Sequence, residues 1–191
     1  TSGQNVMIAD SSALPDQLIP DVVLSAFNSA GQRCSALRVL YLQEDIAEKV
    51  LNVLFGYMDE LVIGDPFDIS TDVGPVIDNV AKRVLEKHID TIGKTGKILY
   101  QCELSNSRTG LFFPPSVVEI KKLKQLEQEV FGPVLHVITY KASELDLIID
   151  DINQSGYGLT LGIHSRIEKR IEKIRNKVNV GNVYVNRNMI G

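Results

Sequence analysis

The chain is organised around Phe27-Asn28-Ser29-Ala30-Gly31-Gln32-Arg33-Cys34-Ser35-Ala36-Leu37-Arg38-Val39-Leu40-Tyr41-Leu42. This stretch predicts the end of an apolar helix, then a tight polar loop, then an apolar strand. Cys34 lies in the loop, and a loop held between two regular elements can fix a reactive side chain in space. Judged by itself, Cys34 is predicted to be a small buried hydrophobe, because free cysteine is among the most buried residue types.

Two arginines flank the cysteine, Arg33 and Arg38. The thiolate is the nucleophilic form of cysteine, and neighbouring positive charge favours it. The order of residues alone leaves open where the two guanidinium groups point.

The 191 residues are 44% hydrophobic and 23% charged, which suits one ordinary domain with a sizeable core. The net charge of −4 argues against a nucleic-acid partner. A short basic run is surrounded by acidic residues and predicts a solvated face; it comprises Lys121, Lys122 and Lys124, with Glu119, Glu127 and Glu129 around it.

The two cysteines, Cys34 and Cys102, lie far apart in sequence and favour a reduced, cytoplasmic chain. There is no Cys-x-x-Cys pair and no His-Glu-x-x-His, so we expect no metal site. No apolar run approaches the roughly 20 residues that a membrane span needs. The first residues lack a basic region and an initiating Met, so we expect no signal peptide and a chain cut or processed from something longer.

Hydrophobic periodicity predicts strands that alternate with helices. We expect strands over residues 5–9, 36–42, 97–100, 134–140, 159–164 and 181–186. A first expected helix ends near Phe27, and Asp10, Ser11 or Ser12 is expected to cap its start. The other expected helices cover residues 44–61, 79–93, 143–154 and 167–178. Ser143 and Ser165 are the expected N-caps of the last two. Pro114-Pro115 excludes a central strand position at that point. The fold class is therefore α/β, a mostly parallel sheet flanked by helices.

A nucleophilic cysteine needs a base or an electropositive site, together with a stabiliser for the oxyanion. The backbone N–H of Cys34 could contribute to the latter. The three histidines are poor partners by position, because His88 lies on a helix and His136 and His164 lie inside strands. We expect each to be structural, which disfavours a Cys–His hydrolase.

Glu127 and Glu129 are alternate residues beside a Phe-Gly-Pro turn. They are either solvated loop carboxylates, or one of them accepts hydrogen bonds from the neighbouring hydroxyls of a ribose or another polyol. The residues alone do not choose between these two interpretations.

Two motifs together resemble those of the aldehyde dehydrogenase superfamily. Gly31-Gln32-Arg33-Cys34 is similar to its catalytic-cysteine motif, and Glu129-Val130-Phe131-Gly132-Pro133-Val134 to its second signature, in the family's order and at about its spacing. Further agreement comes from residues 64–66, 72–75 and 156–159, so the resemblance covers nearly the whole chain. It implies an aldehyde dehydrogenase catalytic-domain-like fold.

Residues 1–5, 32–38 and 181–191 resemble one branch, the dehydrogenase module of bifunctional proline-catabolic flavoenzymes. That resemblance implies oxidation of L-glutamate γ-semialdehyde, the hydrolysed form of 1-pyrroline-5-carboxylate, to glutamate with NAD. It also implies a parent enzyme fused to a proline dehydrogenase domain, with any membrane association coming from another domain. There are two alternatives. The chain could belong to a dehydrogenase of another small aldehyde, or it could be a catalytically inert module that forms a homodimer.

The resemblance also assigns roles. Cys34 would attack the aldehyde, Glu129 would hold the nicotinamide ribose, Phe131 would pack near the nicotinamide ring, and Ser35 would contact the substrate carboxylate. The family's general-base Glu belongs immediately before Thr1, and its oxyanion-hole Asn and cofactor-binding domain belong further upstream. We therefore expect residues 1–191 to be a single catalytic domain truncated at both ends, an excised domain or a gene remnant, with negligible activity alone.

Overall fold

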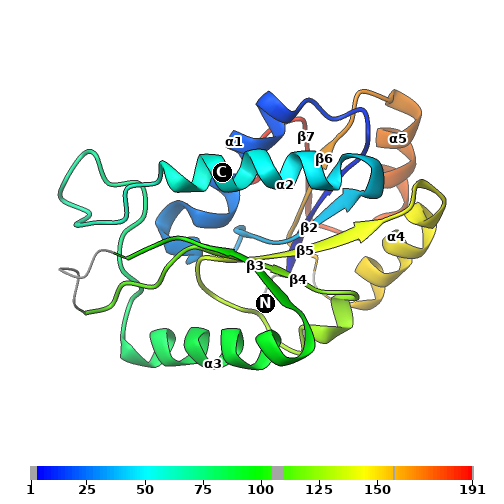
Figure 1. The fold of residues 1–191 in the computed structure, drawn as a ribbon. Coiled ribbons are helices and arrows are strands. Elements are labelled where there is room, and N and C mark those ends of the chain that lie inside the picture. The colour runs from blue at the N-terminus through cyan, green and yellow to red at the C-terminus, as the bar shows by residue number, and fades with distance from the viewer. Residues whose placement is uncertain (1–3, 105–109, 157, 191) are drawn as a thin grey trace.

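Strand β2 (Leu37–Gln43) lies in the middle of a twisted sheet in the computed structural model, which describes residues 4–104, 110–156 and 158–190 (Figure 1). Within these residues the sheet has seven strands in the order β3-β4-β5-β2-β1-β6-β7. The other strands are β1 (Asn5–Ala9), β3 (Lys97–Gln101), β4 (Ser116–Glu119), β5 (Val134–Tyr140), β6 (Thr160–His164) and β7 (Asn182–Val185). Every pairing is parallel except that of the edge strand β3 with β4, which confirms the predicted fold class.

The helices cover both faces of this sheet. They are α1 (Pro15–Phe27), α2 (Glu44–Asp59), α3 (Asn79–Thr95), α4 (Leu145–Gln154) and α5 (Glu168–Lys177), with short 3-10 turns at Asn28–Gly31, Leu123–Gln125 and Ala142–Glu144. Figure 1 shows α1 and α2 on one face and α3 on the other. All residues of β1, β2 and β6 are therefore buried, as is usual for parallel strands that are covered on both sides.

The predicted capping residues were wrong. Helix α1 begins at Pro15 after an N-cap Leu14 that makes no side-chain cap, because the Asp10 carboxylate accepts hydrogen bonds from Ser12 and from Ser165 instead. Ser143 lies in a 3-10 turn, and α4 starts two residues later. Helix α5 begins at Glu168, after an N-cap Ile167 that makes no side-chain cap.

The remaining boundaries agree with the prediction to within two or three residues. Strand β4 begins directly after Pro114-Pro115, so neither proline occupies a ladder position, as predicted. Some predictions fall on residues outside the described ranges. These are the expected turn at Tyr157 and the ends of the two motif stretches, residues 1–3 and residue 191.

Candidate functional site

The two signature motifs lie side by side in space because they precede neighbouring parallel strands. Residues 28–35, which we call the cysteine loop, lead into β2, and residues 129–133, the glutamate segment, lead into β5. Strands β2 and β5 pair in register from Val39↔His136 onward. The amino ends of parallel strands meet at one edge of a sheet. The sheet therefore brings together two motifs that are about a hundred residues apart in sequence.

The cysteine loop turns through three successive residues in the left-handed region, Ser29 (φ 55°), Ala30 (φ 52°) and Gly31 (φ 63°). Such conformations are uncommon for non-glycine residues and are kept only where the surroundings enforce them. Here Asn5 helps to hold the loop, because its Nδ2 donates to the backbone oxygens of Cys34 (2.7 Å) and Ala36 (2.9 Å).

Cys34 is exposed, so the prediction of a buried thiol from the cysteine alone was wrong. The physical reason is that the loop is anchored by its backbone, through Asn5, and not by the cysteine side chain. Its neighbour Ser35 is half-buried, and the Ser35 carbonyl accepts a hydrogen bond from Thr160 Oγ1 at 3.4 Å. The thiol is thus accessible to solvent, and the neighbouring serine is partly so.

The cysteine loop touches the glutamate segment backbone to backbone. A Cβ placed on Gly31 would lie 2.2 Å from the carbonyl oxygen of Gly132, a distance no real Cβ tolerates. Gly31 also needs its positive φ, so two independent constraints select glycine there.

Arg38 joins the two segments, and its role was not evident from the sequence. It is fully buried, and its Nη1 donates to the carbonyl oxygens of Gly31 (2.5 Å) and Gly132 (3.3 Å). Its Nη2 donates to the Arg33 carbonyl oxygen (3.1 Å) and pairs with Glu129 Oε1 (3.4 Å). Burial lowers the pKa of Arg38 and the Glu129 carboxylate opposes that change. The available signal was an arginine inside an otherwise apolar predicted strand, since a buried charge needs partners.

Glu129 is not a freely solvated carboxylate, because its side chain is only 14% exposed and pairs with Arg38. The contact with Arg38 uses Oε1, and within the described residues Oε2 takes part in no hydrogen bond. Phe131 is 42% exposed, and the Arg38 guanidinium carbon lies 5.1 Å from its ring centroid. A carboxylate oxygen with acceptor capacity beside an exposed aromatic ring suits a ligand that carries both hydroxyls and a flat ring.

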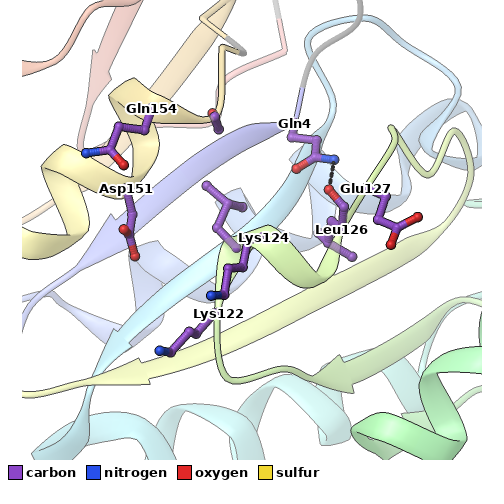
Figure 2. A pocket seen from close by; sticks show the side chains of 9 residues that line it. Gln4, Lys122, Lys124, Leu126, Glu127, Asp151 and Gln154 are labelled. Atoms are coloured by element: carbon purple, nitrogen blue, oxygen red, sulfur yellow. Dashed lines mark hydrogen bonds between the residues drawn. The ribbon is translucent and has the colours of Figure 1, made fainter.

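A cavity of about 590 Å³ lies beside the glutamate segment, between α3 and residues 125–130. Its lining includes Lys87, His88 and Thr91 from the helix and Glu129 from the segment. A second hollow of about 440 Å³ lies near the start of β1, and Figure 2 shows Gln4 there donating to the Leu126 carbonyl oxygen. Lys122 and Lys124 line it and are exposed, as predicted for a solvated basic run.

The histidines are held by other parts of the core. His136 is buried and its Nδ1 lies 2.9 Å from the Arg38 carbonyl oxygen, while its Nε2 lies 2.8 Å from His88 Nε2. His164 is buried 3.2 Å from an Asp21 carboxylate oxygen, and burial lowers its pKa. Within the described residues, none of these contacts involves Cys34, so the structural interpretation is the better one.

The part of the chain that the structure describes contains neither a metal cluster nor a membrane-spanning helix. Over 4–104, 110–156 and 158–190, no three of the His, Cys, Asp and Glu side chains gather as a metal site would require. Among the same residues, no helix is long and apolar enough to cross a membrane.

The fold and the paired motifs define a class of protein, and a family model agrees. The chain belongs to the aldehyde dehydrogenase family, whose model matches residues 1–191. Among curated proteins it is 51% identical over 197 residues to the "Bifunctional protein PutA" of Klebsiella aerogenes, covering 100% of the chain and 15% of that protein. The chain thus spans about a seventh of the length of such relatives.

Solved structures give the same result. A variant of proline utilization A from Bradyrhizobium japonicum matches with a TM-score of 0.95 and 49% identity, over 100% of the chain and 19% of that protein. A Thermus 1-pyrroline-5-carboxylate dehydrogenase with bound NAD matches with a TM-score of 0.89 and 32% identity, over 100% of the chain and 36% of that protein.

Proposed function

We propose that this chain is the nucleophile-bearing catalytic domain of an NAD-dependent dehydrogenase that oxidises L-glutamate γ-semialdehyde to glutamate in proline catabolism. The observation that carries the proposal is the exposed Cys34 on a loop that one buried arginine joins to the segment of Glu129 and Phe131. The names of the relatives, PutA and 1-pyrroline-5-carboxylate dehydrogenase, support the choice of substrate.

In this proposal the Cys34 thiolate attacks the aldehyde carbon and forms a thiohemiacetal. The negative charge that develops on the substrate oxygen would be met by the backbone N–H of Cys34. Ser35, half-buried beside the nucleophile, would donate to the substrate carboxylate through its hydroxyl. Water would hydrolyse the resulting Cys34 thioester, which releases glutamate and restores the thiol.

NAD, when bound, would supply the hydride acceptor that converts the thiohemiacetal into the thioester. The residues present fit this group. Glu129 would accept hydrogen bonds from the nicotinamide ribose through the carboxylate oxygen that Arg38 leaves available, and the exposed Phe131 ring would pack near the nicotinamide. Neither role needs a metal ion.

We propose further that residues 1–191 are one catalytic domain of a longer cytoplasmic enzyme that includes a dinucleotide-binding domain and a proline dehydrogenase domain. Among the described residues, the three histidines and Glu129 have partners other than Cys34, so none of these four groups is held as a general base beside the thiol. Deacylation needs such a base. The isolated chain should therefore turn over no aldehyde.

The test is a segment exchange. The 191 residues replace the matching segment of Klebsiella aerogenes PutA, and NADH formation from L-glutamate γ-semialdehyde is followed for the chimera, for its Cys34→Ala variant and for the isolated chain. We expect NADH from the first alone. A folded chimera that produces no NADH, or one whose Cys34→Ala variant still does, would contradict the proposal. Faster turnover of another small aldehyde would assign a different substrate.

The second candidate is a catalytically inert module that forms a homodimer. Three exposed apolar side chains between α2 and α3 favour this candidate. Their exposed fractions are 98% for Phe67, 104% for Ile69 and 78% for Ile77. A contiguous exposed apolar patch often marks a contact surface, and these three side chains would contribute to one. Light scattering of the isolated chain together with NADH formation by the chimera separates the two candidates, because an inert module would form a dimer and its chimera would produce no NADH.

A further inference from the structure

We propose that Arg38 is a positioning residue that holds the cysteine loop and the glutamate segment as one unit, and so fixes the nucleophile relative to the cofactor-binding carboxylate. The inference rests on the proposed function for the roles of Cys34 and Glu129. Its test reads local order and thiol reactivity, which do not depend on dehydrogenase activity.

Arg38 shares its contacts between the two segments. One terminal nitrogen donates to Gly31 in the cysteine loop and also to Gly132 in the glutamate segment. The other donates to Arg33 in the loop and pairs with Glu129 in the segment. Each nitrogen thus spans both segments, and only the planar fork of a guanidinium can direct hydrogen bonds in this pattern.

The cysteine loop needs contacts from outside itself to keep its conformation. Ser29 and Ala30 occupy left-handed conformations that cost free energy for residues with a Cβ. The carbonyl of Gly31, the next residue, accepts the shortest of the Arg38 hydrogen bonds. Arg38 therefore contacts the loop immediately after its strained turn, where it keeps the turn closed.

Arg38 also acts on the site electrostatically. Arg38 is fully buried, and the carboxylate that it contacts is that of Glu129. Its positive charge would attract a thiolate at Cys34, and its guanidinium lies over the exposed ring of Phe131. One side chain is thus coupled to every group of the proposed site except Ser35. A buried arginine used for packing alone would not need to meet both motifs.

The test uses the isolated 191-residue chain and Arg38→Lys, which keeps the charge and loses the fork. Hydrogen exchange read by mass spectrometry should accelerate about tenfold in residues 28–33 and also in residues 129–133, with strands β1 and β6 unchanged. The matched control is Arg170→Lys, since Arg170 pairs with Asp10 at the opposite edge of the sheet. That control should leave both segments as they are.

Three results would overturn the proposal: unchanged exchange in both segments, faster exchange in the cysteine loop alone, or faster exchange throughout the sheet. The first would show that neither segment depends on the guanidinium fork, which lysine lacks. The last would make Arg38 a general core residue.

If Arg38→Lys does not fold, Glu129→Gln decides the question, because it removes the charge of the half-buried Glu129 side chain and keeps its size. With the carboxylate gone, the Arg38 charge is no longer balanced and acts more fully on the thiol. We expect iodoacetamide to alkylate Cys34 about threefold faster at neutral pH, with Cys102 as the internal reference. An unchanged Cys34 rate would show that the two motifs are not coupled through Arg38.

Discussion

The Nε2 atoms of His88 and His136 lie 2.8 Å apart, across the contact between α3 and β5. A backbone oxygen only accepts, so His136 must donate its Nδ1–H to Arg38 O. With His136 neutral, its Nε2 is the acceptor and His88 Nε2–H the donor. Burial, with the facing His88 ring as a second cause, lowers the pKa of His136 to about 3, and burial lowers that of His88 as well.

This pair predicts loss of stability in mild acid. A histidine whose folded pKa is depressed gives stability that is present above its unfolded pKa, about 6.5, and is lost as pH falls toward its folded pKa. Urea unfolding between about pH 6.5 and 4.5 should show a loss of about 1.4 kcal/mol per pH unit for His136 alone. His136→Gln should flatten this slope. A variant with the slope of the parent chain would refute the assignment.

The two cysteines should differ sharply in reactivity. Cys34 is exposed, whereas Cys102 is buried, and its Sγ lies 3.5 Å from the Met58 carbonyl oxygen. Burial, helped by the Asp59 carboxylate, raises the pKa of Cys102 to about 11. Iodoacetamide near pH 8 should therefore label Cys34 alone in the folded chain and both cysteines in urea, as peptide mass spectrometry would show. Labelling of Cys102 at a comparable rate in the folded state would contradict this prediction.

Asn5 should prove essential to the cysteine loop. Its Nδ2 donates to Cys34 O and Ala36 O, and its Oδ1 accepts from Thr160 N. In Asn5→Asp a carboxylate would face two carbonyl oxygens, so we expect a loss of about 3 kcal/mol at neutral pH. Below the pKa of the new carboxyl, its O–H can donate again and part of the loss should return. Equal loss at both pH values would point to packing instead.

Most of the fold follows from the local pattern of the sequence. Strand β2 and helix α2 were predicted to within two residues, because a continuous apolar run and a 3.6-residue repeat are strong local signals. The failure of the expected Asp10 cap could not be predicted, since its carboxylate bonds to Ser165, 155 residues away, whereas Asp78 caps α3 locally. Whether a polar side chain caps its own helix or bonds elsewhere depends on contacts between distant segments.

The two motifs of the site could be predicted from the sequence, but the contacts that hold them in place could not. The cysteine and glutamate motifs are local strings, and strand order then places them together. Cys34 is exposed while its backbone is anchored by a hydrogen bond from Asn5. The Arg38 side chain is directed by its hydrogen bonds to carbonyl oxygens in two segments. None of these contacts has a signature within a short window of sequence. They arise only when β1, β2 and β5 assemble.

Replacing Gly31 and Gly56 by alanine distinguishes the effect of backbone strain from that of helix propensity. In Gly31→Ala the new Cβ would meet Gly132 O at 2.2 Å, and the φ of +63° is itself costly for alanine. We expect a loss of at least about 2 kcal/mol, from about 1–2 kcal/mol of backbone strain together with the clash. Gly56 is the matched control, because it lies within α2 and a Cβ added there would have open space within 4 Å. Gly56→Ala should gain about 0.5–1 kcal/mol.

The two substitutions add the same methyl group, so the informative result is whether their changes in the free energy of unfolding have opposite signs. Urea denaturation of both variants gives it directly, and the alkylation rate of Cys34 adds a local readout. If the contact between Gly31 and Gly132 sets the position of the nucleophile, Gly31→Ala should change that rate while Gly56→Ala leaves it as in the parent chain. A Gly31→Ala chain as stable as the parent would mean that the cysteine loop can move away from the glutamate segment without cost, which is incompatible with the close approach of these two backbones.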